Sequence, residues 1–217
     1  MTDRPSDRYP GYDVLAKRNG PSWNAKTREV IDERLAIPLT PHFFNVAEWR
    51  CLGAVCDRII PQPPDREKVP VPSYVDDKMH KQSRDGYRYP GMPEQGEAWR
   101  HGLAALDEAA RRDHGKDFAA LDPAQQDAML GDMQHDRLKA DALAGMPAKS
   151  FFQHRIIHDI CAAYYAHPTA WNEIGFGGPA SPRGYVRLEL DRRDPWEAAE
   201  AHPGREKFAR KENARVR

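Results

Sequence analysis

Apolar residues recur every three or four positions along several stretches of the chain, a spacing that is typical of amphipathic α-helices. The clearest stripe comprises Trp99, Leu103, Leu106 and Ala110. Alternation of apolar and polar residues, which is typical of a strand, is confined to the short piece Val186–Leu190. The pattern therefore predicts an all-α fold class, with a single helical domain of about five or six helices. The predicted helices are Pro41–Ile60, Ser73–Gln82, Glu94–His114, one that begins at Asp122, and one that runs from Ser150 to His167.

Residues that commonly start or end helices support these limits. Thr40–Pro41 offers an N-cap followed by a proline in the first turn. Asp122–Gln125 and Ser150–Gln153 both have the spacing of a capping box. Gly115 and Pro168 are residue types at which helices end. The sequence thus predicts the bounds of the helices as well as their existence.

The connections between the helices are rich in proline. The chain has 19 prolines and 15 glycines in 217 residues, so proline exceeds its usual share of about 5% while glycine does not. This composition predicts long, stiff connections such as Pro61–Pro72. We expect an extended N-terminal arm over residues 1–38, a helical domain over residues 39–190, and a charged, solvated C-terminal tail over residues 191–217.

The predicted arm carries large aromatic side chains between its prolines and glycines. We interpret residues 1–38 as a segment that lies along a partner protein, with Tyr9, Tyr12 and Trp23 filling pockets on it. The alternative is a disordered tail. A short helix is expected around Lys26–Leu35.

The predicted loop Pro168–Tyr185 contains the glycines Gly175, Gly177 and Gly178 together with three prolines, which fix the shape of its turns. Aromatic side chains on such a stiff frame would lose little entropy on binding a partner. The alternative is a loop that folds over the core of its own chain. The residues of the arm and the loop that we expect to bind a partner are Tyr9, Tyr12, Trp23, Trp171, Asn172, Phe176, Gly178, Pro179 and Tyr185.

The overall composition narrows the classes of partner. Lys and Arg together number 33, as do Asp and Glu, so the net charge is zero and predicts attraction to neither nucleic acid nor an anionic membrane. Leu, Ile, Val and Phe together number 36, which is below the roughly 20% at which a compact fold on its own becomes doubtful. The sequence therefore favours a domain that completes its apolar burial against another protein.

Segments that would direct the chain to a membrane or out of the cell are not evident. No apolar run approaches the roughly 18 residues that a membrane-spanning helix requires. The first residues are charged and lack the apolar region of a secretory signal. We expect a cytoplasmic protein, or a periplasmic one if an exported partner carries it.

Candidate catalytic chemistry is sparse. His154 and His158 stand four positions apart on a predicted helix, which is the spacing of metal ligands, but Arg155 replaces the glutamate of the zinc-protease pattern. Gly175–Gly178 lacks the lysine of a phosphate-binding loop. We therefore expect no catalytic, cofactor-binding or metal-binding residue in this chain. The alternatives are a stand-alone metal-dependent enzyme that uses His154 and His158, and a generic helical adaptor.

The sequence does not decide whether the three cysteines form a disulfide bond. Cys51 and Cys56 lie five positions apart on one predicted helix, too far apart to be bridged. Either could meet Cys161 from another helix. The alternative is three buried thiols in a reducing compartment.

Three segments of the chain resemble the gluconate 2-dehydrogenase subunit 3 family: Leu39–Pro61, Trp99–Leu130 and Phe151–Pro179. The last segment, FFQHRIIHDICAAYYAHPTAWNEIGFGGP, is the most specific. The resemblance implies a helical subunit without its own active site, bound to a larger flavoprotein of the glucose–methanol–choline oxidoreductase type. That partner would hold FAD, oxidise a sugar or polyol, and pass electrons to a cytochrome c or another acceptor. The small subunit would support the folding, solubility or export of its partner.

Two departures from the family pattern refine this expectation. Many relatives carry a twin-arginine export signal, which this sequence does not show. Relatives often have a longer Gly-Gly-Asn insertion where Thr169–Asn172 follows Pro168 directly. The chain is thus similar to a subgroup that serves glucoside 3-dehydrogenases.

Overall fold

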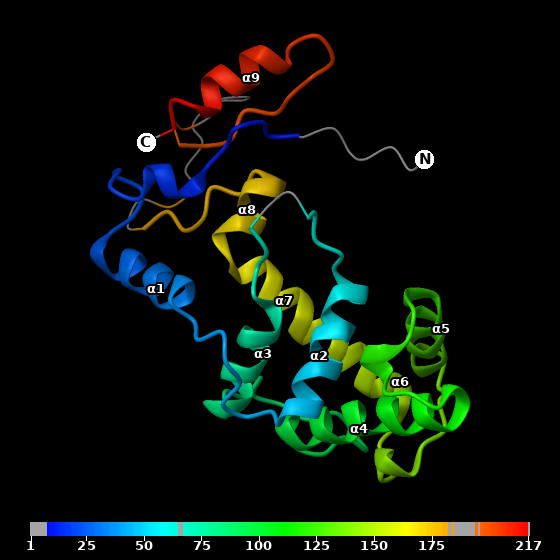
Figure 1. The fold of residues 1–217 in the computed structure, drawn as a ribbon. Coiled ribbons are helices and arrows are strands. Elements are labelled where there is room, and N and C mark those ends of the chain that lie inside the picture. The colour runs from blue at the N-terminus through cyan, green and yellow to red at the C-terminus, as the bar shows by residue number, and fades with distance from the viewer. Residues whose placement is uncertain (1–7, 65–66, 182–183, 185–193, 195, 217) are drawn as a thin grey trace. The chain divides into compact units, whose positions relative to one another are not determined.

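The computed structural model describes residues 8–64, 67–181, 184, 194 and 196–216 (Figure 1). These residues are mostly helical and include no strand, so the predicted all-α fold class is confirmed. The alternating piece Val186–Leu190 lies outside the described residues. In the part of the chain that is described, none of the helices combines the length and the apolar character needed to cross a membrane.

The chain divides into two compact units. The central unit comprises Ile37–Tyr164, and the terminal unit comprises Met1–Ala36 with Tyr165–Arg217. Elements that begin in the central unit are α2 (Val46–Ile59), α3 (Val71–His80), α4 (Gln95–His114), η2 (Phe118–Ala120), α5 (Pro123–Gln134), η3 (Asp141–Leu143), α6 (Ala148–Phe151), η4 (Phe152–Ile157) and α7 (His158–Ala166). The terminal unit has η1 (Val14–Lys17), α1 (Ala25–Leu35), α8 (Pro168–Ile174) and α9 (Glu206–Asn213).

The core of the central unit is built around α4, against which α2 and α6 pack (Figure 1). The predicted stripe of α4 is confirmed, because Trp99, Leu103, Leu106 and Ala110 are all buried. Gly102 lies on the same helix directly under the ring of Phe151. A Cβ atom at position 102 would stand 2.1 Å from two ring carbons of Phe151. The missing side chain therefore allows α6 to approach α4 closely.

Local capping chemistry places the end of α4 and the start of α5 where the sequence predicts them. The Asp122 carboxylate accepts a hydrogen bond from the backbone N–H of Gln125, and the Gln125 side chain accepts one from the backbone N–H of Asp122. Gly115 ends α4 in the left-handed conformation, with φ of 68°. That conformation favours glycine because it has no Cβ atom.

The start of α2 differs from the prediction of a helix that begins at Thr40–Pro41. Asn45 is the actual N-cap and forms a capping box with Glu48. The buried carboxylate of Asp76, on α3, accepts hydrogen bonds from the backbone N–H groups of residues 42–44, at 2.7, 3.0 and 3.0 Å. These bonds satisfy the N–H groups outside a helix, so a tertiary contact overrides the favourable Thr-Pro start.

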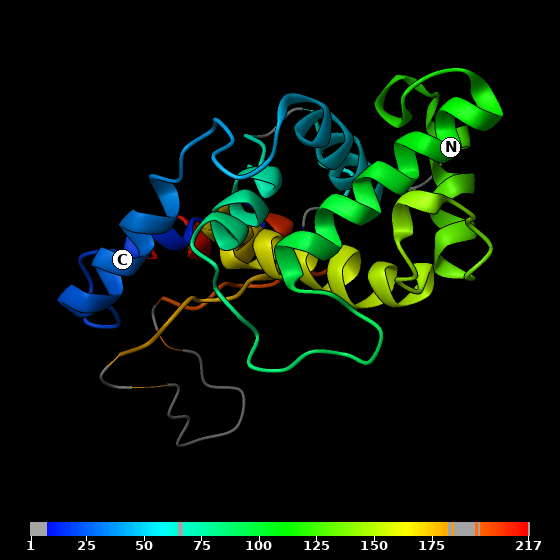
Figure 2. The same ribbon diagram turned by 90° about the horizontal axis from the view of Figure 1, so that it is seen from below.

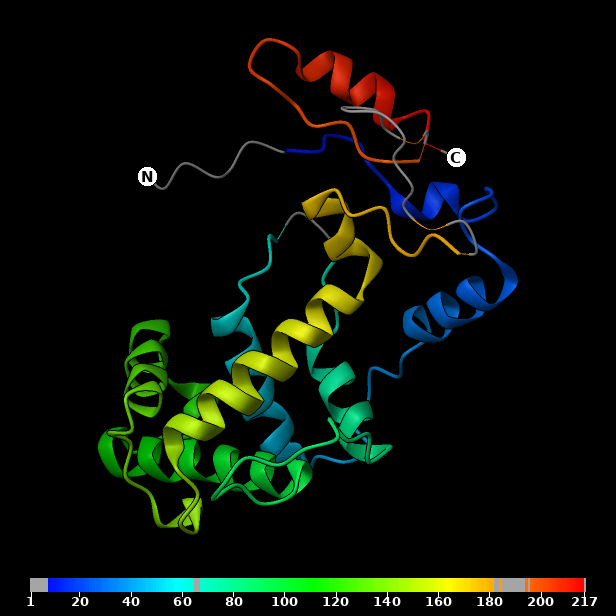
Figure 3. The same ribbon diagram turned by 180° about the vertical axis from the view of Figure 1, so that it is seen from behind.

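Elements α6, η4 and α7 form one continuous helix (Figure 3). It begins at Ala148 rather than at the predicted capping box of Ser150–Gln153. Its middle, η4, is a π-helix, a rare form that occurs frequently at functional sites. The helix ends before Pro168, as predicted. Its predicted apolar face is buried, and consists of Phe152, Ile156, Ile160 and Tyr164.

The terminal unit has its own aromatic core. The buried members of this core are Tyr12, Val14, Trp23, Ile31, Trp171, Trp196, Ala198 and Val216. The amide of Asn213, on α9, donates hydrogen bonds to the backbone oxygens of Pro10 and Ala199. The expected extended arm over residues 1–38 and solvated tail over residues 191–217 are therefore corrected for the described residues, which fold together. The short helix expected around Lys26–Leu35 is confirmed as α1.

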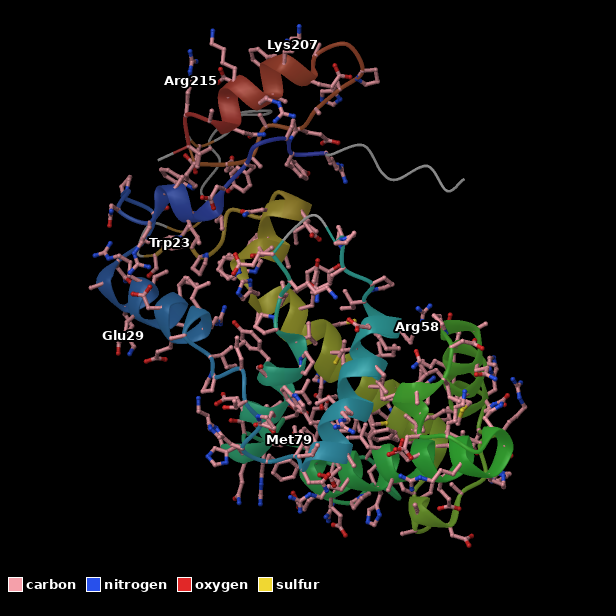
Figure 4. All side chains as sticks on the ribbon, viewed as in Figure 1. Trp23, Glu29, Arg58, Met79, Lys207 and Arg215 are labelled. Atoms are coloured by element: carbon pink, nitrogen blue, oxygen red, sulfur yellow. The ribbon has the colours of Figure 1, made fainter. Side chains whose placement is uncertain are left out.

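Lys17 is a cation inside this aromatic core. Its side chain is fully buried, and its Nζ lies 5.5 Å from the ring centroid of Trp23, labelled in Figure 4, and 6.0 Å from that of Trp196. Its ammonium has no hydrogen-bond partner among the described residues. Burial lowers the pKa of Lys17 to about 8, although the charges of Glu197 and Asp194 oppose the shift. The folded chain therefore holds a lysine that is poorly compensated when charged.

All three cysteines are free thiols. Cys51 and Cys56 are buried and Cys161 is half-buried. Of the alternatives that the sequence left open, the structure has three thiols and no bridge from Cys161 to either of the other two.

Candidate functional site

A buried ion-pair network connects three parts of the central unit. Lys78 lies near the end of α3, Asp85 in the loop that follows, and Arg155 and Asp159 on the helix formed by η4 and α7. Figure 2 shows that loop, residues 81–94, as a long connection between α3 and α4. The network therefore anchors this irregular loop to the π-helix η4.

Asp159 is the centre of the network, and its side chain has no exposed surface. One carboxylate oxygen accepts a hydrogen bond from Lys78 Nζ at 2.8 Å. The other accepts one from Trp99 Nε1 at 2.8 Å and one from Arg155 Nη1 at 3.4 Å. A buried carboxylate is costly unless its oxygens are satisfied in this way.

Asp85 is the second carboxylate. It accepts hydrogen bonds from Lys78 Nζ at 2.7 Å, from Arg155 Nη2 at 3.0 Å and from Gln95 Nε2 at 3.0 Å. Burial by itself would raise the pKa of Asp85, but the hydrogen bonds from Lys78 and Arg155 outweigh it, and the pKa lies below its usual value. Two cations and two carboxylates thus balance each other.

The two histidines considered as metal ligands have different surroundings. The ring of His154 stacks on Tyr89, with centroids 3.4 Å apart and planes at 10°. Burial lowers the pKa of His154, and the nearby Arg155 and His158 add to this effect. His158 instead lies beside the network, with its Nδ1 3.0 Å from an Asp159 oxygen.

A metal ion would have to compete with the lysine of the network. Asp85, His158 and Asp159 offer ligand atoms within 4.8 Å of one another. Lys78 Nζ lies 2.7 Å and 2.8 Å from the oxygens of the two aspartates, where it supplies the positive charge that a metal would supply. The charges of the two aspartates are therefore already balanced within the ion-pair network.

Three of the aromatic residues expected to bind a partner belong to the core of the terminal unit. Tyr12, Trp23 and Trp171 are 5%, 2% and 3% exposed. Their side chains are not presented on the surface, which corrects the expectation that they are. For Trp171 the structure agrees with the alternative, in which the segment folds over the core of its own chain. The Nε1 of Trp171 donates a hydrogen bond to the Tyr165 backbone oxygen at 2.6 Å. Their role in partner binding stays a prediction.

The polar and small residues of the predicted loop have structural tasks. Residues 168–174 form α8, where a loop was expected. Asn172 Oδ1 accepts a hydrogen bond from the backbone N–H of Val14 at 2.8 Å. Gly178 has φ of 67°, and a Cβ atom there would stand 3.0 Å from the Trp171 ring and 3.3 Å from the Trp23 ring. The absence of a side chain at Gly178 therefore allows the backbone to pass close to both rings of the aromatic core.

Other predicted partner residues lie nearer the surface. Phe176 is 43% exposed and contacts Trp171 edge to face, with centroids 5.5 Å apart. Tyr9 is half-buried and packs on Gly175. Pro179 is half-buried, and Tyr185 lies outside the described residues. Of the predicted set, Phe176 therefore offers the most accessible large apolar side chain among those described.

Sequence reasoning missed the ion-pair network. Its signal is the pair Arg155 and Asp159, which stand four positions apart on an otherwise apolar helix. Such a pair indicates a salt bridge along the helix. The partners Lys78 and Asp85 come from a distant part of the chain, and nothing local to them distinguishes them from solvated charges.

Comparison with known proteins identifies one family. The family model described as Gluconate 2-dehydrogenase subunit 3 matches residues 46–178, from the start of α2 into the loop after α8. No curated protein and no solved structure matches the chain.

Proposed function

The chain belongs to the gluconate 2-dehydrogenase subunit 3 family, and we propose that it is the non-catalytic small subunit of a dehydrogenase complex, which binds and stabilises the catalytic subunit. The family match over residues 46–178 is the observation that carries this proposal. The ion-pair network also supports the proposal of a non-catalytic subunit, because the charge of each of its two carboxylates is balanced by cations of the same chain.

Exposed apolar side chains in the matched region support a contact with another protein. Tyr165, Ile174 and Phe176 are 49%, 48% and 43% exposed, within twelve consecutive positions of the terminal unit. Large apolar side chains that remain exposed close together in the sequence can belong to one interaction surface. We assign the surface formed by these three residues, the α8 surface, to contact with the catalytic subunit.

The identity of that catalytic subunit is the finer part of the proposal. We assign to it a flavoprotein of the glucose–methanol–choline type that holds FAD, oxidises a sugar or glucoside, and passes electrons to a cytochrome c or another acceptor. The short connection after Pro168 favours the subgroup that serves glucoside 3-dehydrogenases. On this proposal the small subunit acts in the cytoplasm, or in the periplasm when an exported partner carries it.

Co-expression tests this function. The flavoprotein dehydrogenase is produced with and without this chain, and its soluble yield, flavin content and dehydrogenase activity are measured. All three should fall when the chain is left out, and the two proteins should co-purify in a fixed ratio. Equal yield, flavin content and activity in both preparations would refute the proposal.

Replacing Phe176 by alanine should weaken assembly with the catalytic subunit by about 2 kcal/mol, because an exposed aromatic anchor loses its pocket. The stability of the isolated chain should fall by only about 1 kcal/mol, the contribution of one edge-to-face contact with Trp171. Trp171→Ala should behave in the opposite way and lower the free energy of unfolding by about 3 to 5 kcal/mol, since the side chain fills the aromatic core. Calorimetric binding and urea denaturation measure the two effects.

Phe208→Ala is the matched control for Phe176→Ala. Phe208 is 55% exposed and also belongs to the terminal unit, but it lies on α9, outside the matched residues. The Phe208→Ala substitution should leave both assembly with the catalytic subunit and the free energy of unfolding unchanged. Equal losses of affinity in the Phe176 and Phe208 variants would remove the assignment of the α8 surface.

A further inference from the structure

Two adjoining cavities open in the central unit between α3, the loop of residues 81–94 and the start of α4. The larger has a volume of about 690 Å³ and includes Met79, labelled in Figure 4. The smaller has a volume of about 270 Å³ and lies along the loop. Arg84, Glu94 and Gln95 line both cavities. The larger volume lies within the range of about 300 to 1,000 Å³ that is usual for small-molecule sites.

Gln95 lines both cavities, and its side-chain oxygen accepts no hydrogen bond from the described residues. Its Nε2 donates a hydrogen bond to Asp85 Oδ2 at 3.0 Å, which fixes the orientation of the amide. Turning the amide over would bring two acceptors together. Its Oε1 is buried and has no hydrogen-bond partner among the described residues. A buried acceptor in this state gains from a ligand that supplies an O–H or N–H group, which reaches Oε1 when the neighbouring side chains move aside.

The rim of the cavities carries two guanidinium groups, those of Arg84 and Arg88, beside the carboxylate of Glu94, and Glu97 is a further carboxylate in the lining of the larger cavity. Arg84 Nε and Arg88 Nη1 lie 3.9 Å and 3.5 Å from the two oxygens of Glu94. The side chains of Arg84 and Arg88 are 72% and 62% exposed, so both remain open to a ligand. Because two guanidinium groups share one carboxylate at long distances, a second anion can bind there with charge-assisted hydrogen bonds.

The remaining lining gives each cavity an apolar wall. Phe43 and Met79 contribute to the larger cavity, and Met92 and Pro93 to the smaller. The guanidinium of Arg100 stacks 4.2 Å from the centroid of the Phe43 ring, which holds that ring in place. A few fixed polar groups against apolar walls are the usual composition of a small-molecule site.

We propose that these cavities bind a small anionic molecule rich in hydroxyl groups, with its anion on Arg84 and Arg88 and a hydroxyl donating to Gln95 Oε1. The anion is a carboxylate or a phosphate, and the apolar face of the molecule lies against Phe43 and Met79. The site belongs to the central unit alone and does not depend on the catalytic subunit of the proposed function.

Titration of the full chain with five matched probes tests the site. D-glucuronate and glucose 6-phosphate carry both an anion and hydroxyls, glucose carries hydroxyls alone, and cyclohexanecarboxylate and inorganic phosphate carry an anion alone. Binding is followed by calorimetry and by backbone amide shifts in NMR spectra. At least one of the first two probes should bind about tenfold or more tightly than the other three. The tighter of the two identifies the anion as carboxylate or phosphate.

Two sets of substitutions separate the two contacts. The double variant Arg84→Gln and Arg88→Gln should weaken the charged, hydroxylated probe about tenfold or more while leaving glucose unchanged. Gln95→Met should weaken every hydroxylated probe, glucose included. The matched control is Arg112→Gln with Arg137→Gln, which removes two exposed arginines that line neither cavity and should leave binding unchanged. Urea denaturation of each variant checks that it is folded.

Three results would overturn the site. The first is that no probe saturates the chain below about 10 mM. The second is that glucose 6-phosphate binds no more tightly than inorganic phosphate and D-glucuronate no more tightly than cyclohexanecarboxylate. The third is that the Arg84 and Arg88 double variant, folded as the wild type is, binds the charged probes with unchanged affinity.

Discussion

Replacing Asp159 by alanine should lower the free energy of unfolding by about 3 to 5 kcal/mol, the cost of removing one partner from a buried ion pair. The substitution leaves Lys78 and Arg155 with one carboxylate, Asp85, between them. It also leaves the buried indole N–H of Trp99 without its acceptor. Urea denaturation at pH 7 measures the loss.

Asp159→Asn keeps the shape and one acceptor for Trp99 but removes the charge, so its loss should lie between that of the alanine variant and zero. Asp113→Ala is the control for a broken pair at the surface. Asp113 and its partner Arg112 are 47% and 51% exposed, and the control should cost no more than about 1 kcal/mol. If Asp159→Ala costs no more than this control, the network does not stabilise the central unit.

Replacing Lys17 by methionine should raise the free energy of unfolding at pH 7 by about 3 kcal/mol, which corresponds to a pKa lowered from the usual lysine value to about 8. Methionine keeps the length of the apolar stem and removes a buried ammonium that has no hydrogen-bond partner. Urea denaturation of both proteins at pH 7 gives the difference.

The pH dependence of this difference has a definite sign. Below pH 8 the amine is protonated in both the folded and the unfolded chain, so the full cost of burying the charge is present. Between about pH 8 and pH 10.5 the unfolded chain binds more protons than the folded one, and the wild type gains stability as pH rises. The advantage of Lys17→Met should therefore shrink over this range.

Lys207→Met, on the exposed side of α9, is the matched control and should show neither effect. A Lys17→Met variant that is less stable than the wild type at pH 7 would mean that the contacts with the Trp23 and Trp196 rings outweigh the cost of burial.

Helices whose limits depend on neighbouring residues could be predicted from the sequence. Asp122 and Gln125 lie in the same turn, and their side chains reach each other's backbone without help from the rest of the fold. Gly115 ends α4 for an equally local reason. The start of α2 could not be predicted in this way, because the Asp76 carboxylate that holds residues 42–44 outside the helix comes from α3.

The surroundings of the candidate site residues depended on contacts over longer distances. Trp23 and Trp171 are 148 positions apart and share one core, so a pattern of exposed-looking aromatics was misleading. Lys78 and Asp85 were indistinguishable from surface charges until the fold brought them to Arg155 and Asp159. The unpartnered oxygen of Gln95 has no signal in the sequence at all.

The sequence by itself determined the all-α class, the limits of α4, the start of α5, and the family, because helical periodicity, capping and the family pattern are properties of nearby residues. Only the tertiary structure decided which aromatic side chains are buried, which charges pair, and where cavities remain. The physical reason is that burial and the pairing of charges are set by groups that the chain brings together from distant positions.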